Sequence, residues 1–341
     1  MKLYARLVFL ALALTTVVVV FGAYVRLADA GLGCPDWPGC YGKLSPSHAA
    51  EQIRQAHAAD PHGPVSLPKA WKEMVHRYLA ASLGLLIIGI AALAWRHRER
   101  AGVAPGVALA LLGVVIFQGL LGRWTVTLLL KPAIVTAHLL GGMTTLALLA
   151  WLAVRVAGGG RAQVPARLAW AARIGMGLLV AQIALGGWTS TNYAALACTD
   201  FPSCHGSLWP EADYGNAFHV VRELGMTAEG ELLPLTALTA IHWSHRLGAV
   251  VAGGFLLTFG WRLTRRMATA DLGVLLIAAV LLQIGLGIAN VLLSLPLALA
   301  AAHNAGAAVL VVLMVWINHR LVVQVAQGRR HGVQAGLALR G

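Results

Sequence analysis

The amino-acid sequence predicts an all-α polytopic membrane protein whose eight transmembrane helices form two tandem four-helix bundles related by internal duplication. Three observations support this fold class. Hydrophobic residues make up 58% of the 341 residues and charged residues only 11%, whereas roughly a quarter of a soluble domain is charged. Eight apolar runs approach the ~20 residues that cross the hydrocarbon of a bilayer. Motifs of the first half also recur in the second half, which indicates a repeat.

The apolar runs place the helices in order along the chain. Each run should be helical, because a backbone that contacts lipid must satisfy its own hydrogen bonds. The predicted spans are 7–25, 72–95, 105–123, 132–155, 168–188, 237–261, 271–291 and 298–319. The first span resembles a signal peptide, since Lys2 and Arg6 precede it and Ala28-Asp29-Ala30 resembles a cleavage site. It is long for a signal and has a counterpart in the second half, so we expect it to remain as a membrane helix.

The net charge of +13 is compatible with nucleic-acid binding, but the distribution of the basic residues argues against it. These residues lie at alternate helix ends, which is the positive-inside pattern. They are Lys2, Arg6, Arg96, Arg98, Arg100, Arg155, Arg161, Arg167, Arg262, Arg265, Arg266, Arg320, Arg329 and Arg330. The pattern places both termini and the short loops after helices two, four and six in the cytoplasm, and the loops 26–71 and 189–236 outside. No basic patch interleaved with aromatic residues remains for nucleic acid.

The repeat divides the chain into an N-terminal half (1–157), a linker (158–166), a C-terminal half (167–325) and a cytoplasmic tail (326–341). The stretch from Cys34 to Cys40 matches that from Cys198 to Cys204, because each has the pattern Cys-x-Asp-aromatic-Pro-x-Cys. The pattern Gln-x-x-x-Gly recurs at Gln118, Gln182 and Gln283. We interpret these matches as duplication of a four-helix unit, with both copies in the same orientation.

The four cysteines lie in the two outward loops, where an oxidising environment permits disulfides. The cysteines of each loop are separated by five residues that include a proline-containing turn. This spacing allows their Cα atoms to come within bridging range. Four cysteines allow three connectivities, of which pairing within each loop is the simplest. The pairs are either structural or redox-active, and this spacing does not favour a metal site. Residues 47–60 are predicted to form a short amphipathic helix at the membrane interface.

Four histidines occupy corresponding depths near the outer ends of helices two, four, six and eight. They are His76, His138, His245 and His303. A polar side chain within a membrane helix is costly and by default marks a functional site. Two imidazoles on opposite sides of a planar cofactor form the bis-histidine haem arrangement, and bundle interiors commonly hold such cofactors. The sequence therefore predicts two haem sites, one in each half. The alternative, interhelical hydrogen bonding by histidine, is less consistent with two repeat-equivalent pairs.

Glu73 breaks the symmetry between the halves. It lies three residues before His76 and therefore shares its helix face. A carboxylate in this layer is expected to act as a base or proton relay beside a cofactor. The alternative is a structural ion pair with Arg77 or Lys72.

His242 occupies the position in the second half that corresponds to Glu73. It is a candidate hydrogen-bond partner of a haem propionate, an alternative iron ligand to His245, or a remnant of the repeat. Arg77 directly follows the predicted ligand His76, and Arg246 directly follows the predicted ligand His245. Each is expected either to pair with a haem propionate, since guanidinium fits carboxylate well, or to extend towards the membrane surface.

These residues together resemble the haem A synthase family, eight-helix enzymes of the bacterial plasma membrane and the mitochondrial inner membrane. The features that carry the resemblance span almost the whole chain in the expected order. They are Gly31-Leu-Gly-Cys34-Pro-Asp-Trp-Pro38-Gly-Cys40, Glu73-x-x-His76-Arg77, His138, the loop of Cys198 and Cys204, His245-Arg246 and His303. The cysteine loop and the Glu-x-x-His-Arg stretch are specific in combination. His242 beside the predicted ligand His245 is a departure from the family pattern.

The resemblance implies oxidation of the C8 methyl group of haem O to a formyl group by successive hydroxylation. It implies that His245 and His303 hold a resident haem b, that His76 and His138 bracket the substrate haem, and that Glu73 is the catalytic carboxylate. It also implies the disulfides Cys34–Cys40 and Cys198–Cys204 and a location in the cell inner (plasma) membrane. The expected partners are haem O and its product haem A, a haem O synthase, an electron acceptor and the lipid bilayer; a homo-oligomer is compatible with this set.

Three other functional classes share part of the pattern. A di-haem b membrane electron carrier would bind both haems permanently and would not need Glu73. An outward-facing thiol–disulfide oxidoreductase would use the cysteine pairs but would not need four buried histidines. A haem transporter or chaperone would bind haem without altering it.

Overall fold

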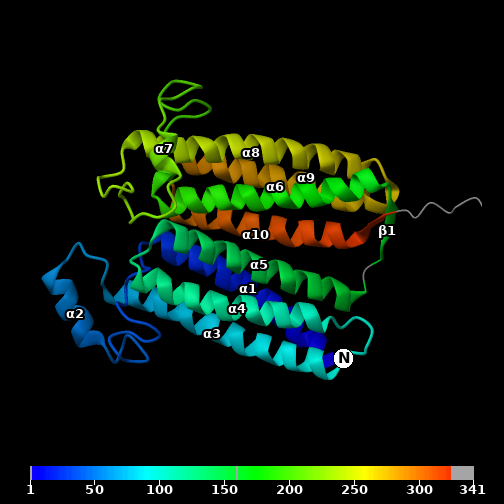
Figure 1. Ribbon diagram of the computed structural model, residues 1–341, viewed down its shortest axis with the longest axis horizontal. Helices are drawn as coiled ribbons and strands as arrows, with labels where there is room; N and C mark the ends of the chain where they lie inside the picture. Colours follow the sequence, from blue (N-terminus) through cyan, green and yellow to red (C-terminus); the bar gives the residue numbers. More distant parts are fainter. Residues whose placement is uncertain (1, 159, 324–341) are drawn as a thin grey trace, which may run out of the picture.

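The computed structural model describes residues 2–158 and 160–323 (Figure 1). In these ranges eight helices are long and apolar enough to cross a membrane, which confirms the predicted all-α polytopic membrane protein. They are α1 (Lys2–Leu27), α3 (Leu67–Arg96), α4 (Pro105–Thr127), α5 (Pro132–Ala157), α6 (Ala166–Thr191), α8 (Leu235–Thr264), α9 (Ala270–Leu292) and α10 (Leu297–Arg320). The predicted tail 326–341, with Arg329 and Arg330, lies outside the described residues.

Prolines mark where several of these helices begin. Helices α4 and α5 start at Pro105 and Pro132, and α6, α8 and α10 directly follow Pro165, Pro234 and Pro296. Proline suits the start of a helix because its fixed φ is already helical and its missing N–H would have no partner in the first turn. The helices run beyond the predicted spans by up to several residues, because an apolar run reveals only the part of a helix that lies in hydrocarbon.

The eight long helices form two bundles that lie side by side, with α6, α8, α9 and α10 above α1, α3, α4 and α5 in Figure 1. Within the first bundle, contacts run from α1 to α3, α3 to α4, α4 to α5 and α5 to α1, so α3 and α5 are diagonally opposite. Helices α8 and α10 are diagonally opposite in the second bundle. Each predicted histidine pair therefore lies on diagonal helices, where two side chains can face a group bound between them. Descent from a duplicated unit stays a prediction.

The two bundles share a continuous apolar interface. Helix α10 packs against α1 and α5, and α5 also packs against α6. Val19, Met143 and Leu146 of the first bundle belong to the same buried cluster as Leu256 and Met314 of the second. The two halves are thus joined by packing as well as by the linker.

The long loops gather at one end of the molecule (Figure 1). Helix α2 (Ala50–Ala59) confirms the short helix predicted at 47–60. Its buried residue Ile53 packs in a cluster with Cys34, Cys40 and Met74, so α2 covers the first cysteine loop. The second loop holds a 3-10 turn, η1 (Ala194–Leu196), and α7 (Tyr214–Ala217). Asp213 caps α7 by accepting a hydrogen bond from the amide of Asn216, at 3.1 Å.

The opposite end of the molecule contains a strand pair that the sequence analysis did not predict. Strand β1 (Ala162–Val164), within the predicted linker, pairs in parallel with β2 (Leu321–Val323), which directly follows α10. A further 3-10 turn, η2 (Met267–Thr269), precedes α9. The pair ties the linker between the halves to the end of the last described helix.

Candidate functional site

The four predicted histidines each pack against a glycine of a neighbouring helix. A Cβ atom built on Gly22 of α1 would lie 2.7 Å from Cε1 of His76 on α3, and one on Gly186 of α6 would lie 2.9 Å from Cε1 of His245 on α8. The corresponding distances are 3.5 Å from Gly122 of α4 to His138 on α5, and 3.1 Å from Gly287 of α9 to His303 on α10. Gly22, Gly186 and Gly287 thus provide space that the imidazole rings occupy, whereas a Cβ atom at Gly122 would make an ordinary contact with His138.

The protein leaves much of the hydrogen-bonding capacity of these rings unused. Among the described residues, Nδ1 of His76, His138 and His303 is buried without a hydrogen-bond partner. All four histidines are only partly buried, although they lie within bundles. Buried polar groups are normally paired, so these rings have the character of ligands for a group that the protein chain does not itself supply.

The donor set fits haem better than a free metal ion. The described residues contain no group of three or more His, Cys, Asp or Glu side chains that could hold a metal. A structural zinc site needs about four protein ligands, whereas the iron of haem takes one or two axial ligands because the porphyrin supplies the others. Two histidines on diagonal helices satisfy the second requirement.

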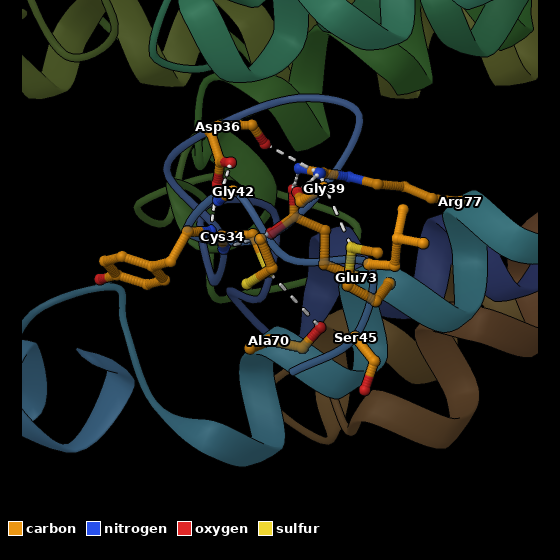
Figure 2. The surroundings of a disulfide bond; sticks show 12 residues. Cys34, Asp36, Gly39, Gly42, Ser45, Ala70, Glu73 and Arg77 are labelled. Carbon is orange, nitrogen blue, oxygen red and sulfur yellow. Dashed lines mark hydrogen bonds and ion pairs between the residues drawn. A yellow bond between two sulfur atoms is a disulfide. The ribbon is translucent and has the colours of Figure 1, made fainter. Parts of the chain in front are cut away.

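Glu73 ties α3 to the first cysteine loop (Figure 2). Its side chain is buried, and Oε2 accepts a hydrogen bond from the amide of Cys34 at 2.9 Å. Oε1 forms an ion pair with Nη2 of Arg77 at 2.5 Å. This ion pair is the structural alternative that the sequence left open, and it is present. The catalytic role of Glu73 stays a prediction.

The side chain of Arg77 holds the same loop by binding backbone carbonyl groups of the loop. Its Nη1 donates to the carbonyl oxygens of Asp36 and Gly39, at 2.8 and 2.5 Å (Figure 2). The guanidinium group is therefore already engaged by the loop and by Glu73. A pairing of Arg77 with a haem propionate stays a prediction.

His242 and Arg246 make corresponding contacts in the second half. Nδ1 of His242 lies 3.2 Å from the amide of Cys198, and Nε2 lies 3.2 Å from Nε of Arg246. A neutral imidazole accepts at only one nitrogen, so only one of these contacts is a hydrogen bond. Arg246 also donates to the carbonyl oxygens of Cys198, Asp200 and Ser203, at 2.8–2.9 Å. His242 thus contacts the second cysteine loop at the position where Glu73 contacts the first. A contact of His242 with haem stays a prediction.

The cysteines form the predicted pairs. Cys34 bonds to Cys40 and Cys198 to Cys204, each with a Cα–Cα distance of 4.9 Å, within the normal range for a disulfide. All four cysteines are fully buried. The disulfides pack against the N-terminal parts of α3 and α8, next to Glu73 and His242.

An aspartate organises the turn in each cysteine loop. Asp36 accepts hydrogen bonds from the amides of Tyr41 and Gly42, at 2.6 and 2.7 Å. Asp200 accepts from the hydroxyl of Ser203 at 2.6 Å and from the amides of His205 and Gly206 at 2.7 and 2.9 Å. These bonds, led by those from Ser203 and Gly206, hold the pKa of Asp200 well below its usual range. This role of the aspartates was not predicted from the sequence, although the repeated Cys-x-Asp pattern marks both positions.

The repeated glutamines have a second role that was not predicted from the sequence. Nε2 of Gln182 lies 3.0 Å from both Nδ1 and the carbonyl oxygen of His245. Nε2 of Gln283 donates to the carbonyl oxygen of His303 at 2.9 Å. The Gln-x-x-x-Gly pattern marked the repeat, but the partner of each amide became visible only once the helices were placed together.

A comparison with known families matches residues 5–315 to the COX15-CtaA family, described as cytochrome oxidase assembly protein. The chain belongs to this family. The matched region contains the four histidines, both cysteine loops and nearly all of the eight long helices.

Several similar proteins match the chain over nearly its whole length. A protein of Shewanella oneidensis named Heme A synthase is 40% identical over 316 residues, which is 91% of this chain and 94% of that protein. Proteins of the same name from Sphingopyxis alaskensis and Nitrosospira multiformis are 29% and 28% identical over 347 and 342 residues. These alignments cover 95% and 92% of this chain, and 92% of each of those proteins. The family expected from the sequence is confirmed.

Proposed function

We propose that this multi-pass membrane protein is a haem A synthase, an oxidoreductase that converts haem O to haem A. The observation that carries the proposal is the pair of histidines on diagonal helices in each bundle, each ring seated against a glycine. The similarity to relatives named Heme A synthase supports the same conclusion. The reaction would oxidise the C8 methyl group of haem O to a formyl group through successive hydroxylation.

The two histidine pairs have different tasks in this proposal. His245 and His303 hold a resident haem b, while His76 and His138 bracket the substrate haem O. When bound, the resident haem supplies the electron-transfer chemistry, and the protein supplies binding, orientation and exclusion of water. Nδ1 of His76, His138 and His303 is buried without a partner among the described residues, which supports the assignment of these side chains as ligands.

Glu73 serves the substrate half as a proton acceptor in this proposal. Oxidation of a methyl group releases protons, and Glu73 is a buried carboxylate one turn from His76. Its contacts with Cys34 and Arg77 fix the orientation of the carboxylate. Glu73 would thus have two roles, since the same side chain anchors the cysteine loop.

The disulfides are structural in this proposal. Thiol–disulfide exchange requires that an attacking thiolate reach a sulfur atom. The four cysteines are fully buried, and the loops that contain them are held by Arg77 and Arg246. The burial disfavours the alternative of an outward-facing thiol–disulfide oxidoreductase.

The proposed location is the cell inner (plasma) membrane, with both termini in the cytoplasm and the cysteine loops on the outer face. The positive-inside distribution supports this orientation. The ends of α3, α5, α8 and α10 that bear the histidines then lie near the outer face, as do α2 and α7.

Product analysis tests the proposed function. The protein would be expressed with a haem O source, and the porphyrins extracted with acid–acetone and identified by chromatography and mass spectrometry. We expect haem A or its hydroxylated precursor only when the protein is present. Haem O that remains unchanged in membranes containing the intact protein would contradict the proposal and favour a di-haem electron carrier or a haem transporter.

A further inference from the structure

Three of the four histidine helices share a packing motif with a neighbouring helix. The neighbour carries glutamine and glycine four residues apart, and the histidine helix carries a glycine three residues after the histidine. The motif joins α4 to α5, α6 to α8, and α9 to α10. The second glycine makes room for the glutamine in all three pairs, and the first makes room for the imidazole in the two pairs of the second bundle.

The second glycine places the glutamine side chain directly on the backbone of the histidine helix. A Cβ atom built on Gly248 would lie 2.4 Å from Oε1 of Gln182, and one on Gly306 would lie 2.1 Å from Oε1 of Gln283. Any larger residue at these positions would collide with the amide. The amide therefore lies within reach of the histidine one turn earlier on the helix.

The amides of the C-terminal half contact both the backbone and the ring of their histidines. Nε2 of Gln182 lies 3.0 Å from the carbonyl oxygen and 3.0 Å from Nδ1 of His245. Nε2 of Gln283 lies 2.9 Å from the carbonyl oxygen and 3.4 Å from Nε2 of His303. Each glutamine thus links a ring to a neighbouring helix.

The oxygen atoms of the same amides could accept a hydrogen bond from the other tautomer of the ring, in which the nitrogen that faces the amide carries the proton. Oε1 of Gln182 and Oε1 of Gln283 are buried without a partner among the described residues. An imidazole that binds a metal through one nitrogen carries a proton on the other, and that N–H normally donates to an oxygen. A primary amide offers a donor to a bare ring nitrogen and an acceptor to a protonated one, so it suits the ring before and after ligation.

The N-terminal half lacks these contacts. Nε2 of Gln118 is buried without a partner among the described residues, and so is Nδ1 of His138. At His76 the motif is missing, because Val18 and Leu79 occupy the positions of the glutamine and the second glycine. The amide contacts therefore distinguish one histidine pair from the other.

We infer that Gln182 and Gln283 are positioning residues, which fix the imidazoles of His245 and His303 for a permanently bound haem. The absence of such contacts at His76 and His138 suits a site that takes up and releases its haem. The inference rests on the proposed assignment of resident and substrate haem to the two halves. Loss of the group that hydrogen-bonds to the non-ligating nitrogen of a metal-bound histidine typically weakens metal binding about 10- to 100-fold.

The rate of haem loss tests this inference. The purified full-length protein would be mixed with excess apomyoglobin as a haem acceptor, and transfer followed by absorbance. We expect Gln182→Leu and Gln283→Leu to lose haem b about 10- to 100-fold faster than wild type and to alter the low-spin electron paramagnetic resonance signal. Gln118→Leu is the matched control, with the same substitution in the same motif, and should lose haem b at the wild-type rate.

A second variant keeps the test decisive if Gln182→Leu does not fold. Gly248→Ala retains the amide but displaces it, and should also accelerate haem loss. Wild-type haem loss and an unchanged resonance signal in a folded Gln182 or Gly248 variant would overturn the inference. His245→Ala separates this outcome from failure of the proposed function: if it retains the haem b of wild type, the assignment of the resident haem itself is wrong.

Discussion

Glu73 and His242 occupy corresponding positions of the two halves but differ in charge and in acid–base chemistry. Both side chains reach the amide of the first cysteine in their loop, and both contact the arginine four residues later. The loop needs only an acceptor at this position, and either a carboxylate or a neutral imidazole provides one. The loop does not require the charge of Glu73, which favours an additional role for this carboxylate in the N-terminal half.

Replacing Glu73 by glutamine separates its two roles. Glu73→Gln keeps an oxygen that accepts from the Cys34 amide but removes the charge and the proton-accepting group. We expect the disulfide and the folded protein to persist while haem A production falls about 10²- to 10⁴-fold, the usual contribution of a general base. Extraction of haem O and haem A measures the loss. Wild-type production by Glu73→Gln would restrict Glu73 to a structural role.

The glycine beside each imidazole gives a second prediction at this scale. A methyl group at Gly186 would lie 2.9 Å from Cε1 of His245, closer than normal contact. Gly186→Ala is therefore expected to displace the ring and reduce the haem b content of the purified protein. Gly177→Ala on the same helix is the control, because a Cβ atom there has no neighbour within 4 Å. Equal haem content in the two variants would contradict this role of Gly186.

At the scale of elements, the sequence predicts the helices well and their contacts less well. All eight long helices follow from apolar runs, and α2 follows from its amphipathic pattern. Strands β1 and β2 do not, because three residues in a linker or after a helix carry no periodic signal. The ion pair of Glu73 with Arg77 was one of two interpretations open from the sequence, and it is present. The contacts of Glu73 with the Cys34 amide and of Gln182 with His245 could not be predicted, since each depends on how a loop or a second helix is placed. The repeat marks the two histidine pairs in the sequence, and the structure places each pair on diagonal helices; their role as haem ligands stays a prediction.

The second cysteine loop should become less stable in acid. The hydrogen bonds to Asp200 lower its pKa in the folded protein below the value of about 3.9 for a free side chain. Their stabilising contribution is fully present above that value and is lost as the pH falls towards the folded pKa. Hydrogen exchange of residues 198–206 should accelerate as the pH falls below about 4, after correction for intrinsic exchange. Asp200→Asn should remove this pH dependence, and persistence of the dependence in that variant would assign it to another group.

At the scale of the whole molecule, two bundles of similar construction carry different site chemistry. The shared interface of α1, α5, α6 and α10 holds the bundles together, and the two cysteine loops cover the ends of α3 and α8 that bear His76 and His245. In the proposed function the second bundle retains haem b, while the first exchanges haem O for haem A. Two differences between the halves are consistent with this division. Glu73 of the first half corresponds to His242 of the second, and Val18 and Leu79 replace the glutamine and the second glycine of the motif.

The most direct test measures haem b content and porphyrin product together in four variants, His76→Ala, His138→Ala, His245→Ala and His303→Ala, each expressed with a haem O source. Variants of the second half should lose haem b and make no haem A. Variants of the first half should retain haem b and accumulate haem O. Equal loss of haem b from all four variants, or wild-type haem A production by a variant of the first half, would contradict the division of tasks between the two histidine pairs.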